Sequence, residues 1–156
     1  MVGNVKTSLG KSMINILLEL VGTAECNDIC ADIFLNQQLV GNYTAGLEPY
    51  AINLTVPDDC FSHTLKIVMS GKNTQHTIVS QDGNIITDAS IVFSILEFEH
   101  INMMPIFCQG KTCYYHSHND PARSVELDEF YGYMGCNGYV DIQFDTPIYL
   151  WFNEHF

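Results

Sequence analysis

The chain has 156 residues, 47% of them hydrophobic, so it is long enough to bury the core of one domain. Its formal net charge of −12 comes from 18 acidic residues against six Lys and Arg, which excludes a phosphate-neutralising surface and hence a nucleic-acid partner. Such an acidic balance keeps proteins in solution, and it also suits cation binding or docking on a basic protein surface.

The N-terminal residues differ in pattern from the rest of the chain. Residues 1–12 are polar and without period, so they predict an arm or an upstream extension ahead of a domain over residues 13–156. Lys6 and Lys11 precede only a short apolar stretch, and no stretch approaches the roughly 20 apolar residues of a membrane helix. We therefore expect no signal peptide, no transmembrane segment and no membrane partner.

Alternation of apolar and polar residues predicts strands along most of the domain. It is found in Ile14–Leu20, Ile33–Leu35, Tyr50–Val56, Leu65–Met69 and Val140–Phe144. In the stretch Ala89–Phe98, apolar residues occupy both the odd and the even positions, which predicts a central strand covered on both faces. After Thr146 and Pro147 the alternation resumes through Ile148, Leu150 and Phe152, which predicts a bend and a last strand.

These stretches indicate the fold class. No window combines helical recurrence of apolar residues with capping residues, so we expect little helix. About eight to ten strands in one domain indicate an all-β fold, a single antiparallel β-sandwich of jelly-roll type. The least regular region, residues 107–138, is expected to be a loop region and holds most of the unusual residues.

A zinc site is one hypothesis for this region. The soft and imidazole ligands that zinc prefers are Cys108, Cys113, His116 and His118. Their spacing is not that of a standard zinc site, so packed cysteines and surface histidines are the alternative interpretation. Because the chain carries no secretory signal, its six cysteines are expected to be unpaired thiols.

A calcium site is a second hypothesis. Asp82, Asn84 and Asp88 supply the hard oxygen ligands that calcium takes. They lack the full alternation and the terminal glutamate of an EF-hand loop. The chemistry of a tight turn at Gly83 explains the same residues without a metal.

Some residues could be combined into a catalytic site, but none of these combinations matches a known catalytic motif. Cys113 could pair with His116, and Glu126 with Asp128 and Glu129, but there is no nucleophile elbow, phosphate-binding loop or metalloprotease helix. Acidic pairs of this kind usually form a solvated edge. We therefore expect a protein that is not an enzyme.

Tyrosines in the C-terminal third are candidate contact residues. Most aromatic residues there are expected in the core of the sandwich. Tyr114, Tyr115, Tyr131 and Tyr133 lie among turn residues, so they are predicted to anchor a protein interface or to stack on sugar rings.

Part of the chain resembles a family of carbohydrate-binding modules. The stretches that carry this resemblance are Ser62–Ile67, Asp82–Asn84, Asp88–Ile91 and Glu97–Asn102. They resemble small β-sandwich modules that bind xylan through calcium, in which an acidic loop contacts the sugar hydroxyls. Only Asp82 and Asp88 lie in comparable places here. The resemblance implies a calcium-assisted module that recognises a host or environmental glycan.

The C-terminal stretches Tyr133–Tyr139 and Phe144–Trp151 are similar to the ends of small proteins of tailed bacteriophages, especially those of cyanobacteria. This resemblance implies a structural or accessory virion protein, on the capsid or the tail, assembled in the host cytoplasm. Its partners would be other virion proteins or copies of itself. The virion role is the first functional hypothesis, and the glycan-binding module is the alternative. Neither requires a cofactor; calcium is the ion that either could bind, and zinc less readily.

Overall fold

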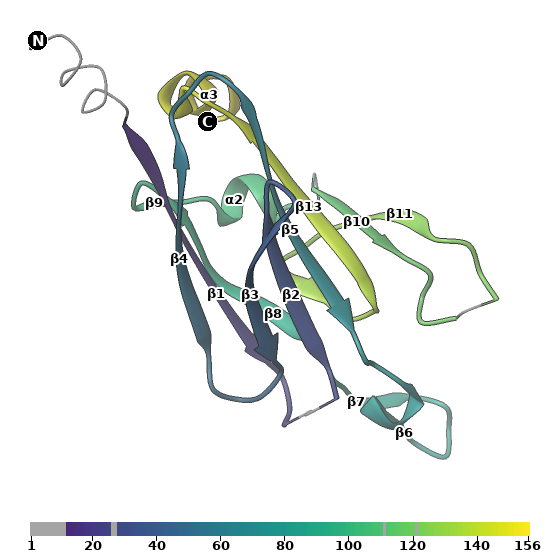
Figure 1. Ribbon diagram of the computed structural model, residues 1–156. Helices are drawn as coiled ribbons and strands as arrows, with labels where there is room; N and C mark the ends of the chain where they lie inside the picture. The colour runs from purple at the N-terminus through teal and green to yellow at the C-terminus, as the bar shows by residue number, and fades with distance from the viewer. Residues whose placement is uncertain (1–11, 26–27, 111, 121) are drawn as a thin grey trace, which may run out of the picture.

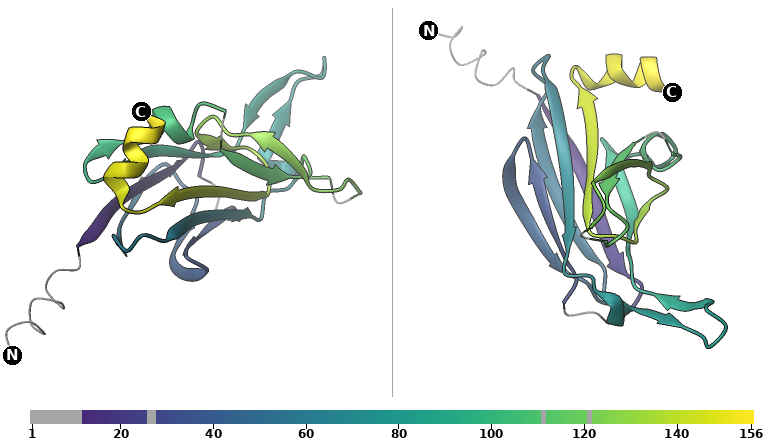
Figure 2. Two further views of the ribbon diagram at one scale, coloured as in Figure 1. Left: turned by 90° about the horizontal axis from the view of Figure 1, so that it is seen from above. Right: turned by 90° about the vertical axis from the view of Figure 1, so that its right-hand side faces the viewer.

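A computed structural model of the chain describes residues 12–25, 28–110, 112–120 and 122–156. Two antiparallel sheets pack face to face, and a separate two-stranded hairpin extends from one end of them (Figure 1 and Figure 2). The predicted all-β sandwich is therefore confirmed. Apart from Ser12, the predicted N-terminal arm lies outside the described residues.

The first sheet has the strand order β12-β8-β1-β4, with β9 paired to β8. Its strands are β1 (Met13–Gly22), β4 (Tyr50–Pro57), β8 (Ile91–Phe98), β9 (Ile101–Asn102) and β12 (Tyr133–Met134). Ile14, Ile16, Leu18 and Leu20 of β1 are buried, so the alternation in the sequence marks the face that packs inward.

The second sheet has the strand order β11-β10-β13-β5-β2-β3. Its strands are β2 (Cys30–Leu35), β3 (Gln38–Thr44), β5 (Ser62–Ser70), β10 (Cys113–His116), β11 (Glu126–Glu129) and β13 (Gly138–Asp145). The described residues contain thirteen strands rather than eight to ten, because strands of two to four residues leave no visible alternation. Three of these short strands, β10, β11 and β12, lie in the region expected to be a loop.

Aromatic contacts join the two sheets. Phe98 of β8 and Phe144 of β13 have ring centroids 4.6 Å apart, and Phe93 of β8 lies 4.8 Å from Phe130. All four side chains are almost fully buried, and burial of each contributes about 1.5–3 kcal/mol. The core therefore fixes the two sheets relative to each other.

Strand β8 is central in its sheet, but its apolar pattern has another cause than burial on both faces. Its pairing with β1 skips Ser94, because Glu19 pairs with Ile95 and Leu20 with Phe93. This β-bulge exchanges the two faces, so residues of both parities point into the core along one strand.

The predicted C-terminal strand is wrong. Residues Ile148–His155 form helix α3, which buries Ile148, Trp151 and Phe152 and leaves Tyr149 and Leu150 exposed. This i, i+3, i+4 spacing is helical. The other helices are the 3-10 turn η1 (Thr74–His76) and α2 (Met104–Phe107). In the described part of the chain, no helix is long and apolar enough to cross a membrane.

The third sheet is a hairpin of β6 (Thr77–Val79) and β7 (Ile85–Asp88) that projects away from the sandwich (Figure 2). It exposes four large apolar side chains: Ile78, Val79, Ile85 and Ile86. The four side chains form an exposed apolar patch outside the core of the sandwich.

Candidate functional site

The two faces of the six-stranded sheet differ in character. Ile33, Ile67, Val140 and Ile142 point inward and are fully buried. The alternate residues of the same strands point outward and include polar and charged side chains. The outer face therefore contributes little to the core and is available for a ligand.

Cross-strand pairing places the outward residues in rows. Phe34 pairs with Lys66, and Lys66 with Asp141. Thr64 pairs with Gln143 in the next row. Because residues directly opposite each other on antiparallel strands have close Cβ atoms, the first row forms a continuous strip across β2, β5 and β13, and the second a strip across β5 and β13.

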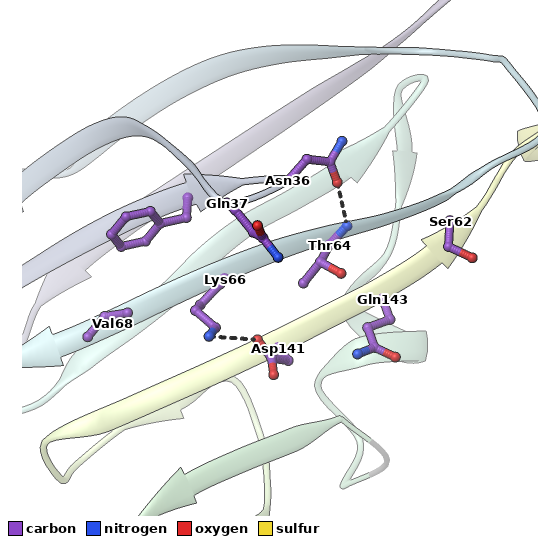
Figure 3. Close-up of a pocket in the computed structure, with 9 residues that line it drawn as sticks. Asn36, Gln37, Ser62, Thr64, Lys66, Val68, Asp141 and Gln143 are labelled. Atoms are coloured by element: carbon purple, nitrogen blue, oxygen red, sulfur yellow. Dashed lines mark hydrogen bonds and ion pairs between the residues drawn. The ribbon is translucent and has the colours of Figure 1, made fainter.

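A groove with a volume of about 710 Å³ follows these rows (Figure 3). Its lining residues come from β2, β5, β13 and the turn after β2, and they are Phe34, Asn36, Gln37, Ser62, Thr64, Lys66, Val68, Asp141 and Gln143. Three amides and two hydroxyls are both donors and acceptors, and they lie beside one lysine and one carboxylate. The groove can therefore form hydrogen bonds of both senses with an uncharged ligand.

One end of the groove is formed by the turn between β2 and β3. Asn36 and Gln37 have φ values of 49° and 70°, the left-handed conformation of both central residues in a tight hairpin turn. The Asn36 side chain accepts a hydrogen bond from the Thr64 backbone N–H at 2.9 Å. Asn36 is thus held in place, and the neighbouring Gln37 side chain is exposed toward the groove.

The carboxylate of Asp141 is under-satisfied. Its Oδ1 atom is buried and, among the described residues, is the one buried side-chain oxygen or nitrogen without a hydrogen-bond partner. The Lys66 ammonium lies 4.0 Å away, within ion-pair range but beyond hydrogen-bond length. Lys66 also lies over the Tyr139 ring, 4.4 Å from its centroid. Oδ1 itself is closed to solvent, so a ligand hydroxyl would bond the rest of the carboxylate, whose side chain is 19% exposed.

The three predicted calcium ligands do not come together. Asp82 and Asn84 lie in the turn at the tip of the β6–β7 hairpin, whereas Asp88 lies at its base, paired with Thr77. The Asp88 carboxylate accepts hydrogen bonds from the Lys72 ammonium at 2.5 Å and from the Thr77 hydroxyl at 2.7 Å. A lysine therefore already neutralises the acid at the base.

The pKa of Asp88 reflects this contact. Desolvation raises it, but hydrogen bonds from Lys72 and Thr77 and the lysine charge outweigh that cause, so the pKa lies below its ordinary value. The Lys72 ammonium is almost fully buried and also donates to the Gly135 carbonyl at 2.6 Å. Asn137 bonds both the backbone N–H and the carbonyl of Lys72. Lys72 thus ties the base of the hairpin to the turn between β12 and β13.

The four predicted zinc ligands do not form one site, because only His116 and His118 lie close together. Cys108 is buried after helix α2, where its thiol contacts Met104 Sδ at 3.5 Å and burial raises its pKa to about 11. Cys113 points to the outer face of β10, whereas His116 points inward. Because the two side chains point to opposite faces of β10, Cys113 and His116 cannot form the catalytic pair considered above.

His116 and His118 instead meet Cys136, a cysteine that the sequence did not single out. The ligand atoms of the three side chains lie within 4.8 Å of one another. Asp128 of the edge strand β11 accepts from His116 Nε2 at 2.9 Å. The pKa of Asp128 is held below its ordinary value, first by the Glu129 backbone N–H and then by His116. Glu126, Asp128 and Glu129 are otherwise exposed.

The four predicted tyrosines have different environments. Tyr114 is buried and its hydroxyl bonds the backbone of Cys136, so the prediction of a surface role for it is wrong. Burial raises its pKa strongly. Tyr115 lies on the outer face of the sheet, stacked on Tyr139 at 4.9 Å. Tyr131 and Tyr133 are 55% exposed and remain candidates for contact.

Sequence reasoning missed the groove, although its signal was present. Lys66, Asp141 and Gln143 occupy the polar parity of two predicted strands. That parity shows which side chains face outward, but it does not show which strands are neighbours.

No protein-family model and no curated protein matches the sequence. Two solved structures are similar in fold. One is vCBM60 in complex with galactobiose, with a TM-score of 0.48 and 8% identity over 81% of this chain and 95% of the other. The second is the selenomethionine form of vCBM60, from work on two families of calcium-dependent carbohydrate-binding modules linked by circular permutation; it has a TM-score of 0.48 and 8% identity over 82% and 88%.

At this TM-score the likeness carries no argument about a ligand. Neither structure is described as part of a virus particle, and the predicted virion location stays a prediction.

Proposed function

We propose that the protein is a non-catalytic domain that binds a neutral oligosaccharide in the groove on the outer face of β2, β5 and β13. The observation that carries the proposal is the lining of the groove, in which amide, hydroxyl, lysine and carboxylate groups lie beside the ring of Phe34. Sugars offer hydroxyls that donate and accept, together with C–H faces that pack on aromatic rings.

The charge of the site favours a neutral ligand. The groove contains one lysine and one aspartate, Lys66 and Asp141, so its side chains carry no net charge. The chain as a whole carries −12 and repels polyanions. An open strip across three strands also fits an extended chain of sugar units better than a compact cofactor, which needs a closed pocket.

Calorimetric titration against a panel of xylo-, galacto- and gluco-oligosaccharides tests this proposal. Gln143→Ala removes an exposed amide from the groove and is expected to weaken binding roughly fivefold, the equivalent of about 1 kcal/mol for one hydrogen bond. The matched control is Asn53→Ala, which removes an exposed amide-bearing side chain from β4 in the opposite sheet. A flat response from the wild-type protein to the whole panel would remove the proposal.

The same titration distinguishes the groove from a calcium loop. We expect binding to survive the calcium-selective chelator EGTA, because the groove residues supply the hydrogen bonds themselves. A loss of binding in EGTA that is restored by added calcium would instead favour a site at Asp82 and Asn84.

Assembly through the β6–β7 hairpin is a second candidate function. Ile78, Val79, Ile85 and Ile86 are each more than half exposed on a two-stranded sheet whose outer edges are not paired within the described residues. Such an edge can pair with the same edge of a second copy. The predicted structural role in a virion belongs to this candidate.

Light scattering after size exclusion tests the candidate. If the hairpin joins two copies, the wild-type protein is a dimer and Ile78→Lys together with Ile86→Lys makes it a monomer. A monomer at all accessible concentrations would remove pairing between copies. Mass spectrometry of purified particles of the source virus tests the virion role, which is abandoned if the chain is absent from them.

A further inference from the structure

Three side chains with metal-ligating atoms converge at the end of the six-stranded sheet, away from the groove. His116 is the last residue of β10, His118 follows two residues later, and Cys136 lies in the turn between β12 and β13. One atom from each lies within 4.8 Å of the other two. Two imidazoles and one thiol at this separation can share a single ion.

The turn after β10 is shaped to bring the two histidines together. His118 and Asn119 have φ values of 55° and 59°, which non-glycine residues adopt at a cost of about 1 kcal/mol each. The result is that the two imidazole rings lie 4.5 Å apart between centroids and nearly perpendicular. Backbone strain that the surroundings maintain is often found where side chains must meet for function.

The cysteine turn is tied to the histidine turn and to the sheet. The Asn137 backbone N–H donates to Asn119 Oδ1 at 2.7 Å. The Tyr114 hydroxyl donates to the Cys136 carbonyl at 2.7 Å and accepts from the Cys136 N–H at 2.9 Å. Both turns are therefore held in place by groups other than the three candidate ligands.

A carboxylate orients the buried histidine. His116 is 4% exposed, and its Nε2 lies 2.9 Å from Asp128 Oδ2. If Nε2 carries the proton, the lone pair is on Nδ1, which accepts the His118 backbone N–H at 3.0 Å. Metal-ligating histidines usually donate their second nitrogen to a carboxylate or carbonyl in this way, and a metal at Nδ1 would replace this one hydrogen bond.

We propose that His116, His118 and Cys136 bind a zinc ion, with Asp128 orienting His116. Nitrogen and thiolate ligands are the set that zinc prefers, in tetrahedral geometry. Three protein ligands leave the fourth position of the tetrahedron to a water molecule or to Glu126, whose Oε2 lies 3.7 Å from His118 Nε2 but outside the three-residue cluster. The ion would join the end of β10 to the turn before β13. This inference does not depend on glycan binding in the groove.

Cobalt substitution of the full, metal-stripped chain tests the proposal. We expect one equivalent of Co²⁺ to give the thiolate-to-cobalt charge-transfer band and the intense visible bands of a tetrahedral site, and Zn²⁺ to abolish both. Cys136→Ser removes the charge-transfer band. His118→Ala, at a position 44% exposed, is expected to weaken zinc binding at least about tenfold without unfolding the chain.

Matched controls separate the site from general effects. Cys60→Ser changes an exposed cysteine outside the cluster, and His100→Ala changes an exposed histidine; both variants should retain the spectrum and the affinity of the wild type. Asp128→Asn keeps all three ligands and is expected to weaken zinc binding by about 10- to 100-fold. Circular dichroism of each variant verifies that the sandwich is intact.

Two results would overturn the proposal. One is a wild-type protein that gives no thiolate-to-cobalt band. The other is a band that Cys60→Ser reduces as much as Cys136→Ser does. Zinc protection of Cys136 from alkylation, read by mass spectrometry, gives an independent measure, and an alkylation rate that zinc leaves unchanged also contradicts the site.

Discussion

The inner and outer faces of the six-stranded sheet are formed by the same strands, but the inner face packs in the core and the outer face is exposed to solvent. Ile142 and Gln143 are neighbours on β13, and the first is fully buried whereas the second is exposed in the groove. The inner face determines the fold because its contacts are with the opposite sheet. The outer face makes no contact with the opposite sheet, so polar groups that cluster there, such as the under-satisfied Asp141, need an explanation outside folding.

Truncation of an inner residue should produce the largest effect. Ile142→Ala leaves a cavity between the two sheets and is expected to lower the free energy of unfolding by about 3 kcal/mol. Gln143→Ala, one residue along the strand, should change it by less than about 0.5 kcal/mol. Urea unfolding followed by circular dichroism measures both. Equal losses in the two variants would contradict the division of the sheet into two faces.

Lys72 is a buried lysine, and its removal should have the next largest effect. Lys72→Met leaves the Asp88 carboxylate and the Gly135 carbonyl without their shared donor, at a cost of about 2–3 kcal/mol. Proteolysis within the β6–β7 hairpin should rise in this variant, because the lysine ties the base of the hairpin to the turn before β13. Unchanged cleavage would mean that the hairpin is held by other contacts.

In Lys72→Met, the dependence of the free energy of unfolding on acidic pH should also change. The pKa of Asp88 is lowered in the folded state, so its stabilisation is complete above the unfolded value of 3.8 and is lost as the pH falls from there through the folded pKa. In Lys72→Met that pKa returns toward its ordinary value. The free energy of unfolding should therefore depend less steeply on pH below 3.8, which chemical unfolding at a series of acidic pH values measures.

Asp141→Asn should have a small effect on stability. The change removes the charge of a partly buried carboxylate but also its ion pair with Lys66, so we expect the free energy of unfolding to change by less than about 1 kcal/mol. Glycan binding, measured by the same calorimetric titration, should weaken in this variant. A variant that is much less stable but binds the glycan as tightly as the wild type would make Asp141 a structural residue.

The sequence predicts the sandwich well and the candidate sites poorly, for a physical reason. Alternation identifies the longer strands because burial of one face is a local, periodic property, as in Ile14–Leu20. Helix α3 was predicted as a strand because the spacing of Ile148 and Phe152 fits the period of two of a strand as well as the spacing of a helix. Bringing Lys66 next to Asp141, or Cys136 next to His116, depends on strand neighbours and turns that are far apart in sequence. No local pattern specifies them.

Backbone NMR during titration with oligosaccharides from the panel tests glycan binding in the groove directly, because it locates the ligand on the chain. If the groove binds the glycan, we expect amide shifts clustered at Phe34–Gln37, Thr64–Val68 and Asp141–Gln143, on the outer face of the sheet. We expect no shifts at the tip of the β6–β7 hairpin. Shifts confined to Asp82 and Asn84, or no shifts with any glycan that binds, would contradict binding in the groove.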